Sequence, residues 1–132
     1  MQKASETKDK IISLIKSVGP SYPGRIAKAT GLSTLFVSAF LAELVSEKKL
    51  KISNMKIGTS PLYYVEGQEE ELEKFIQYLN LREKEAFQLL KQNEILEDEK
   101  LSPVIRVALR NIKDFAFPVS VRVDSDEKLF WR

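Results

Sequence analysis

Residues 26–44 read IAKATGLSTLFVSAFLAEL, and this stretch decides the fold because a glycine joins two apolar-patterned segments. Gly31 stands where a short turn needs a positive backbone φ angle, and Ser33 is placed to cap the following segment with its hydroxyl group. Beyond Ser33, apolar residues recur at the helical spacing i, i+3, i+4 and i+7, at Val37, Phe40, Leu41 and Leu44. The pattern predicts two helices joined by a tight turn, the second of which buries one apolar stripe.

The flanking residues predict one more helix before this pair and a hairpin after it. TKDKIISLIKSV, residues 7–18, has apolar positions at helical spacing. GPSYPG then ends this helix, because a proline disfavours helix at the residue before it, and the second helix is expected from near Pro23 to Gly31. Later, LKIS and LYYVE are two short runs rich in β-formers around NMKIGTSP. They predict a β-hairpin with a loop of several residues at its tip.

This order of elements resembles the winged helix-turn-helix superfamily over residues 7–65, about half of the chain. Gly-Leu-Ser at the turn and Val-Ser-x-x-Leu-x-x-Leu along the third helix are shared with many archaeal and bacterial transcription regulators. The resemblance implies an α+β, mainly helical fold of three helices and a hairpin. In DNA-binding members the third helix enters the major groove and the hairpin, or wing, lies along the backbone. Other winged helices dock proteins, so the fold alone does not settle the function.

The candidate DNA contacts fall into two kinds. The third-helix face opposite the stripe holds Thr34, Leu35, Ser38, Ala39 and Ala42, none of which makes a bidentate contact to a base. The hydroxyls of Ser33, Thr34 and Ser38 are therefore the groove candidates. Positive charge lies outside this face and suits phosphate contacts, unless it merely solvates the surface. The phosphate candidates are Arg25, Lys28, Lys48, Lys49, Lys51 and Lys56.

The second half carries a faint repeat of the first. Asn80 and Glu83 predict a capping box, and Ser102 followed by Pro103 predicts another helix start. A shift of 68 residues places Ile105, Ala108, Leu109 and Ile112 on the buried stripe of the third helix, and two strand-like runs follow around DSDE. We therefore expect two winged-helix domains in tandem, 1–66 and a divergent 67–132. The alternative is an α/β extension packed on a single winged helix.

In the tandem interpretation the repeated helix carries a basic ridge opposite its stripe, formed by Arg106, Arg110 and Lys113. Guanidinium groups suit guanine edges or phosphates. In the alternative interpretation, Glu97, Asp98 or Glu99 forms ion pairs with these basic residues, which are then not free to bind DNA. The aromatic residues near the C-terminus are expected in the core rather than on a platform for single strands, which needs exposed rings among basic residues. These residues are Phe115, Phe117, Phe130 and Trp131.

Composition narrows the function further. The chain has no cysteine or histidine, which excludes thiol and imidazole catalysis and the usual zinc sites, so we expect no enzyme, metal or cofactor. No apolar run is long enough for a bilayer and no secretory signal is seen, so a cytoplasmic protein is expected. Residues 1–66 hold ten Lys and Arg against five Asp and Glu, whereas residues 67–132 hold eleven against fourteen. This asymmetry favours a polyanion partner for the first half.

Two functions follow from these observations. The first is a DNA-binding protein, a transcription regulator or chromatin-associated factor, that contacts duplex DNA mainly through phosphates with modest sequence preference. The second is a protein-interaction module, resembling the tandem winged helices of endosomal-sorting or transcription-initiation assemblies. The uncharged third-helix face and the acidic second half favour the second function. Homodimerisation through the helices between residues 69 and 92 is left open.

Overall fold

The computed structural model describes residues 2–132, and its fold is α+β and mainly helical. The chain divides into two compact units, of which the first ends at Lys74 and the second comprises Phe75–Arg132. Within the described residues no single helix is both long and apolar enough to cross a membrane; the helices Pro23–Thr30 and Thr34–Ser46 pass that test only as a pair bent by 115°.

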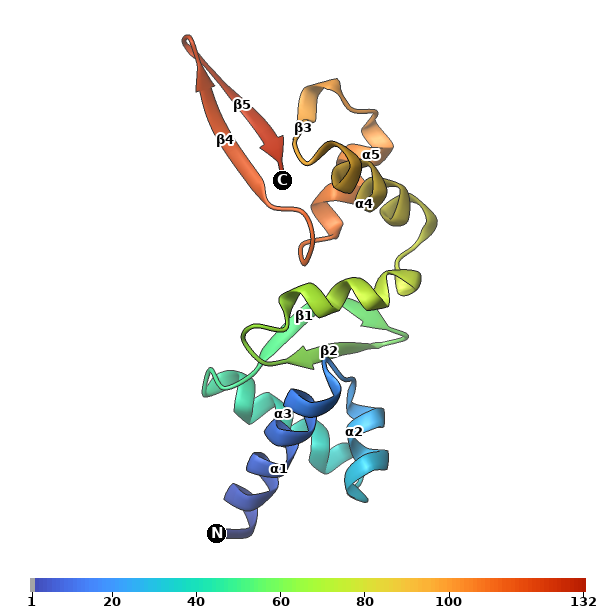
Figure 1. The fold of residues 1–132 in the computed structure, drawn as a ribbon, viewed down its shortest axis with the longest axis vertical. Coiled ribbons are helices and arrows are strands. Elements are labelled where there is room, and N and C mark those ends of the chain that lie inside the picture. Colours follow the sequence, from blue (N-terminus) through green and yellow to red (C-terminus); the bar gives the residue numbers. More distant parts are fainter. Residues whose placement is uncertain (1) are drawn as a thin grey trace. The chain divides into compact units, whose positions relative to one another are not determined.

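The first unit consists of three helices followed by a hairpin (Figure 1). Antiparallel β1 and β2 pair with each other, and Ser21 forms an isolated bridge to Tyr63 on the other side of β2. A 3₁₀ helix, η1, follows the hairpin and crosses the boundary between the units. The elements are α1 (Gln2–Val18), α2 (Pro23–Thr30), α3 (Thr34–Ser46), β1 (Lys51–Ile57), β2 (Ser60–Tyr64) and η1 (Glu69–Tyr78). The winged-helix order expected from the sequence is confirmed.

The turn between α2 and α3 has the geometry that its residues predict. Gly31 adopts a left-handed conformation with φ of 75°, and the Ser33 hydroxyl accepts a hydrogen bond from the Phe36 backbone N–H at 3.2 Å. The stripe of α3 lies in the core, with Val37, Leu41 and Leu44 fully buried and Phe40 partly buried. It packs against Ile11 and Ile15 of α1 and Ile26 of α2. The helix pair is therefore held by a continuous apolar core.

The hairpin is longer than its sequence suggests. Only Gly58 and Thr59 lie between the strands, whereas the sequence predicts a loop of several residues. The difference arises at an irregularity in the register between Ile52 and Lys56. The buried Ser53 hydroxyl fills the irregularity, because it donates to the Met55 carbonyl at 2.6 Å and accepts from the Leu62 N–H at 2.9 Å. A side chain therefore satisfies backbone groups at the interrupted ladder, which local propensity does not reveal.

The second unit consists of two helices, a short 3₁₀ helix and three strands, with a hairpin at its end. Its three-stranded antiparallel sheet has the order β3-β5-β4. The tandem arrangement expected from the sequence stays a prediction. The elements are α4 (Leu81–Asn93), β3 (Leu96–Glu97), η2 (Asp98–Lys100), α5 (Pro103–Asn111), β4 (Pro118–Val123) and β5 (Asp126–Trp131).

The predicted helix starts of the second unit are confirmed. Asn80 and Glu83 form the capping box at the start of α4, and Ser102 precedes α5 with Pro103 in its first turn. The stripe of α5 is buried at Ala108 and Leu109, and Ile112, just after the helix, is buried as well. The sequence therefore located the helices correctly, although it did not resolve β3 and η2.

The C-terminal aromatic residues only partly follow the expected core placement. Trp131 is buried and Phe115 packs edge-on against Phe87, with 5.2 Å between ring centroids. Phe130 is partly buried, whereas Phe117 is 53% exposed. The expectation of core packing is thus wrong for Phe117, which directly precedes β4.

Candidate nucleic-acid interface

The outward face of α3 combines short polar side chains with large apolar ones. Thr34, Ala39 and Ala42 are exposed, as expected, and Ser38 is partly buried. Leu35 is 79% exposed and Phe36 is 61% exposed, although the sequence analysis did not single out Phe36. Hydroxyl and apolar groups contact base edges and thymine methyl groups, but they discriminate weakly between bases. This face therefore suits contact with a groove without strong sequence reading.

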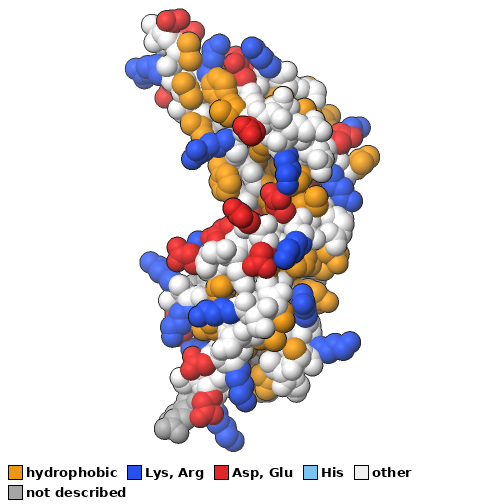
Figure 2. Space-filling model, in the orientation of Figure 1, with side chains coloured by type: hydrophobic (Ala, Val, Ile, Leu, Met, Phe, Trp, Pro, Cys, Tyr) orange, Lys and Arg blue, Asp and Glu red, His pale blue; other side chains and the backbone are white. Residues whose placement is uncertain are grey.

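Four of the six predicted phosphate-contacting residues carry unpaired charge. Arg25 and Lys28 are exposed on α2, Lys48 follows α3, and Lys56 lies on β1. Among residues 2–132 none of the four forms an ion pair with an acidic side chain. Figure 2 shows Lys and Arg side chains spread over the part of the surface formed by α1–α3 and the first hairpin. These four residues, called the open cations below, are available to a polyanion.

The other two predicted residues are paired with acidic groups. The Lys51 ammonium lies 3.0 Å from a carboxylate oxygen of Glu69. The hydrogen bond between them raises the pKa of Lys51 and lowers the pKa of Glu69. Lys49 lies 3.9 Å from Glu47, at the edge of ion-pair distance. A phosphate would have to displace Glu69 to reach Lys51, so Lys51 is the weaker candidate.

Lys48 holds an unusual backbone conformation at the end of α3. Its φ angle is 62°, in the left-handed region that favours glycine. The Lys48 N–H donates to the Val45 carbonyl at 3.0 Å, and the Lys49 N–H donates to the Leu44 carbonyl at 2.9 Å. This is the Schellman pattern of helix termination, in which glycine usually occupies the left-handed position. Lysine at this position is therefore strained, and strained residues concentrate at functional sites.

A contact between α1 and α3 neutralises the acidic residues at the end of α3. Lys8 on α1 lies 2.9 Å from Glu43 and 3.1 Å from Glu47. Hydrogen bonds to these carboxylates, that to Glu43 first, raise the pKa of Lys8. Since residue 8 and residue 43 meet only in the folded unit, no spacing rule predicts the cluster. The pairing reduces the negative charge next to the proposed DNA-facing surface.

In the second unit, two of the three residues of the predicted basic ridge converge on one buried carboxylate. Asp98 is 2% exposed. It accepts hydrogen bonds from Arg110 at 2.8 and 3.2 Å, from Arg106 at 2.9 Å and from the Trp131 indole N–H at 2.9 Å. The bond from Arg110 is the largest cause that holds the pKa of Asp98 far below its ordinary value, although burial opposes it. Lys113 is exposed beyond the end of α5.

This arrangement favours the ion-paired alternative for Arg106 and Arg110. The Arg110 guanidinium also lies over the Trp131 ring, 5.3 Å from its centroid, and donates to the Arg106 carbonyl at 2.9 Å. Each guanidinium has only part of its donor capacity left for a ligand. The cluster therefore fastens α5 to η2 and β5. Of the signals in the sequence, only the acidic neighbours Glu97, Asp98 and Glu99 pointed to it.

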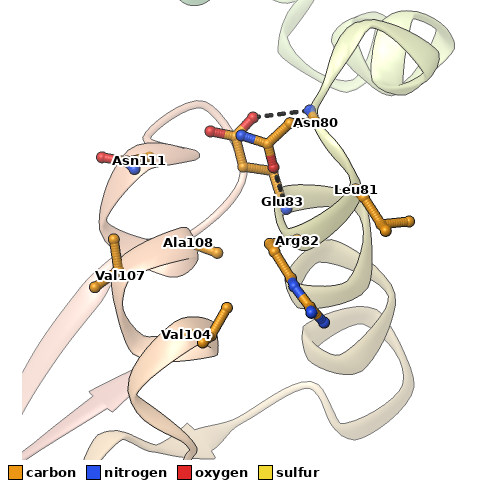
Figure 3. A pocket seen from close by; sticks show the side chains of 8 residues that line it. All are labelled: Asn80, Leu81, Arg82, Glu83, Val104, Val107, Ala108 and Asn111. Atoms are coloured by element: carbon orange, nitrogen blue, oxygen red, sulfur yellow. Dashed lines mark hydrogen bonds between the residues drawn. The ribbon is translucent and has the colours of Figure 1, made fainter.

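The second unit also has an open groove of about 480 Å³ between the start of α4 and α5. Figure 3 shows Val104 and Ala108 of α5 on the side that faces Arg82 of α4, and Leu81 and Val107 also line the groove. The polar groups of α4 in the groove are engaged: Glu83 completes the capping box with Asn80, and Arg82 pairs with Glu85 at 3.1 Å. The groove is an apolar surface rather than an arrangement of catalytic groups.

The fold and surface of the first unit define a winged helix-turn-helix with exposed positive charge. A comparison with family models agrees: residues 7–67, just under half of the chain, match the family described as FaeA-like protein. That family consists of winged-helix regulators that bind DNA, so the match over this unit is consistent with a DNA-binding regulator. No curated protein and no solved structure matches the chain.

Proposed function

We propose that the chain is a cytoplasmic transcription regulator that binds duplex DNA through the first unit with modest sequence preference. In this proposal α3 faces the major groove with Thr34 and Ser38, and Ser33 lies at its N-terminus. The open cations contact phosphates beside the groove. The observation that carries the proposal is the set of four basic side chains without acidic partners on a fold whose matched family binds DNA.

The chemistry of the contacts limits the expected specificity. Phosphate contacts position a protein on the duplex, whereas bidentate contacts to bases specify sequence. The exposed face of α3 carries no arginine, lysine, asparagine or glutamine for the bidentate contacts. Arg106, Arg110 and Lys113 belong to a secondary surface in the tandem proposal, where Lys113 is exposed and the two arginines are paired with Asp98.

A comparison of two lysines on the same strand tests the proposal. Lys56→Ala removes an open cation, whereas Lys51→Ala removes a lysine already paired with Glu69. In a mobility-shift titration, Lys56→Ala should weaken binding to duplex DNA of any sequence by a similar factor. The slope of log affinity against log salt concentration should become less steep by about 0.9. Lys51→Ala should have the smaller effect. No binding of the unmodified chain to duplex DNA at low salt would reject the proposal, and parallel titrations with single-stranded DNA and RNA would identify another preferred ligand.

The exposed apolar residues of α3 favour one second function. Leu35 and Phe36 lie in the first turn of the helix, beside Ala39 on the same outward surface. Large apolar residues surrounded by small ones are suited to a protein partner. In this alternative, Leu35→Ser with Phe36→Ser would abolish association with that partner, while Lys56→Ala would leave it unchanged. If the chain instead binds DNA through phosphates, Lys56→Ala should weaken binding more than the double serine variant does. The order of the two effects therefore distinguishes the two functions.

A further inference from the structure

The β4 strand is a free and only lightly protected edge of the second sheet. In the order β3-β5-β4 it pairs on one side only, and Figure 1 shows β4 and β5 as a long hairpin. Natural edge strands are usually shielded by charged residues, above all lysine, by proline, by a bulge or by shortness. β4 spans Pro118–Val123 with an uninterrupted register; its only shielding residues are Pro118 at its first position and a single charge, Arg122. Such an edge is a template for another strand.

The hydrogen-bond pattern identifies the free backbone groups. The Phe117 N–H donates to the Arg132 carbonyl at 2.8 Å, and the Arg132 N–H donates to the Phe117 carbonyl at 3.0 Å. Because bonding alternates along an antiparallel pair, Val119, Val121 and Val123 also direct their backbone groups toward β5. Ser120 and Arg122 therefore direct theirs outward. The three valines share one face of the sheet, where Val119 and Val121 line an apolar hollow of about 510 Å³ with Ile95 and Phe130.

We propose that β4 pairs with β4 of a second copy of this chain, antiparallel and about a two-fold axis at Val121. Ser120 of each copy exchanges N–H···O=C bonds with Arg122 of the other, and Val119 lies opposite Val123. Arg122, the only charged residue from 119 to 123, then faces a serine. The valine faces of the two copies join into one apolar stripe. This inference does not depend on DNA binding.

Other registers of the β4–β4 pair are less favourable than the one centred on Val121. An axis at Arg122 would place two arginines directly opposite each other, and like charges there are destabilising. An axis at Ser120 would oppose Arg122 to Pro118, which has no N–H to donate. The opposite edge of the sheet is β3, only Leu96–Glu97. Growth beyond two copies is therefore blocked, so the assembly is a closed dimer.

Site-directed crosslinking tests the register directly, since the natural chain has no cysteine. In the proposed dimer the two Val121 Cα atoms lie about 4.5 Å apart, which suits a disulfide. Val121→Cys should give a covalent dimer under mild oxidation. Lys128→Cys is the matched control, because Lys128 is the cross-strand neighbour of Val121 on β5. The two Lys128 positions would be roughly 14 Å apart, three strand spacings, so this variant should stay monomeric on a denaturing gel.

Light scattering on the full chain without added cysteine gives the second measurement. The unmodified protein should have twice the monomer mass, and Ser120→Pro should have the monomer mass. Proline at residue 120 removes an outward N–H while leaving the bonds to β5 intact, and Ser120→Thr should remain dimeric. Fluorescence of Trp131 verifies that each variant keeps its fold. A monomeric natural chain, a dimeric Ser120→Pro variant, or equal crosslinking of the two cysteine variants would overturn the proposal.

Discussion

At the scale of single residues, two charged side chains have opposite relations to the fold. Lys48 adopts a left-handed conformation that lysine tolerates poorly, and its ammonium is unpaired among the described residues. Asp98 is buried and satisfied by three donor side chains. Lys48 therefore destabilises the fold slightly and leaves its charge exposed. Asp98 stabilises the fold, because its charge links α5 to η2 and β5.

We predict that Lys48→Gly increases stability while weakening DNA binding. Glycine relieves the left-handed conformation, which costs an ordinary residue roughly 1 kcal/mol, and it removes one phosphate contact. Urea denaturation should show the higher free energy of unfolding, and a duplex titration should show the lower affinity. Lys28→Gly has no such backbone strain to relieve and should lose stability. Equal DNA affinity of Lys48→Gly and the unmodified protein would exclude Lys48 from the interface.

We predict that Asp98→Asn destabilises the second unit by about 1 to 3 kcal/mol, because charge-assisted hydrogen bonds from two partly exposed arginines to a carboxylate become weaker bonds to a neutral amide. The folded-state pKa of Asp98 lies below its ordinary 3.8, so its contribution is present above that pH and is lost as the pH falls through and below it. Trp131, the only tryptophan and a direct partner of Asp98, reports this unfolding by fluorescence.

The comparison across pH provides the control for this prediction. Between neutral pH and about pH 3 the unmodified protein should lose stability more steeply than Asp98→Asn, since the variant has no carboxylate to protonate at that position. Parallel curves for the two proteins would show that Asp98 does not stabilise the fold through its charge.

At the scale of elements, α3 and α5 each precede the hairpin of their unit but present different surfaces. Each buries one apolar stripe. The outward face of α3 carries no basic residue, and its one acidic residue, Glu43, pairs with Lys8, whereas the arginines of α5 are engaged by Asp98. The element with the basic ridge is therefore the less available one, and the element without basic residues is the one proposed to face DNA.

We predict that Ala39→Lys strengthens DNA binding. A lysine on the exposed face of α3 would add a phosphate contact and steepen the salt slope by about 0.9 if this face approaches the duplex. Gln88→Lys adds a charge at an exposed position of α4 and serves as the matched control, with little expected change. Fluorescence anisotropy at several salt concentrations distinguishes them. Weaker binding by Ala39→Lys would indicate that α3 faces a tightly packed partner instead.

At the scale of the whole molecule, the two units have different proposed roles: the first binds DNA and the second forms the dimer. The first carries the open cations and the residues that match a family of DNA-binding regulators. The second carries the Asp98 cluster and the β4 edge. A dimer formed through β4 would present two DNA-binding units, and linked units gain affinity only where both engage at once.

The salt dependence of DNA binding by the unmodified chain reports how many phosphates its basic side chains neutralise. The four open cations predict a slope of log affinity against log salt of about −3.6 per bound chain, whereas all six predicted basic residues would give about −5.4. Titration of duplex DNA over a range of salt concentrations measures this slope. The steeper value would mean that Lys51 and Lys49 leave their acidic partners on binding, and a slope near zero would contradict phosphate-mediated binding.

The sequence by itself determined the helix-turn-helix, both predicted helix caps and the buried stripe of α3, because these depend on local backbone preference and on spacing along one helix. Only the tertiary structure decided which charges are free. The partners of Lys8, Lys51 and Arg110 come from other elements, and their distances exist only after the chain has folded. The same holds for the bulge at Ser53 and for the position of β4 at the edge of its sheet, since strand order depends on long-range pairing.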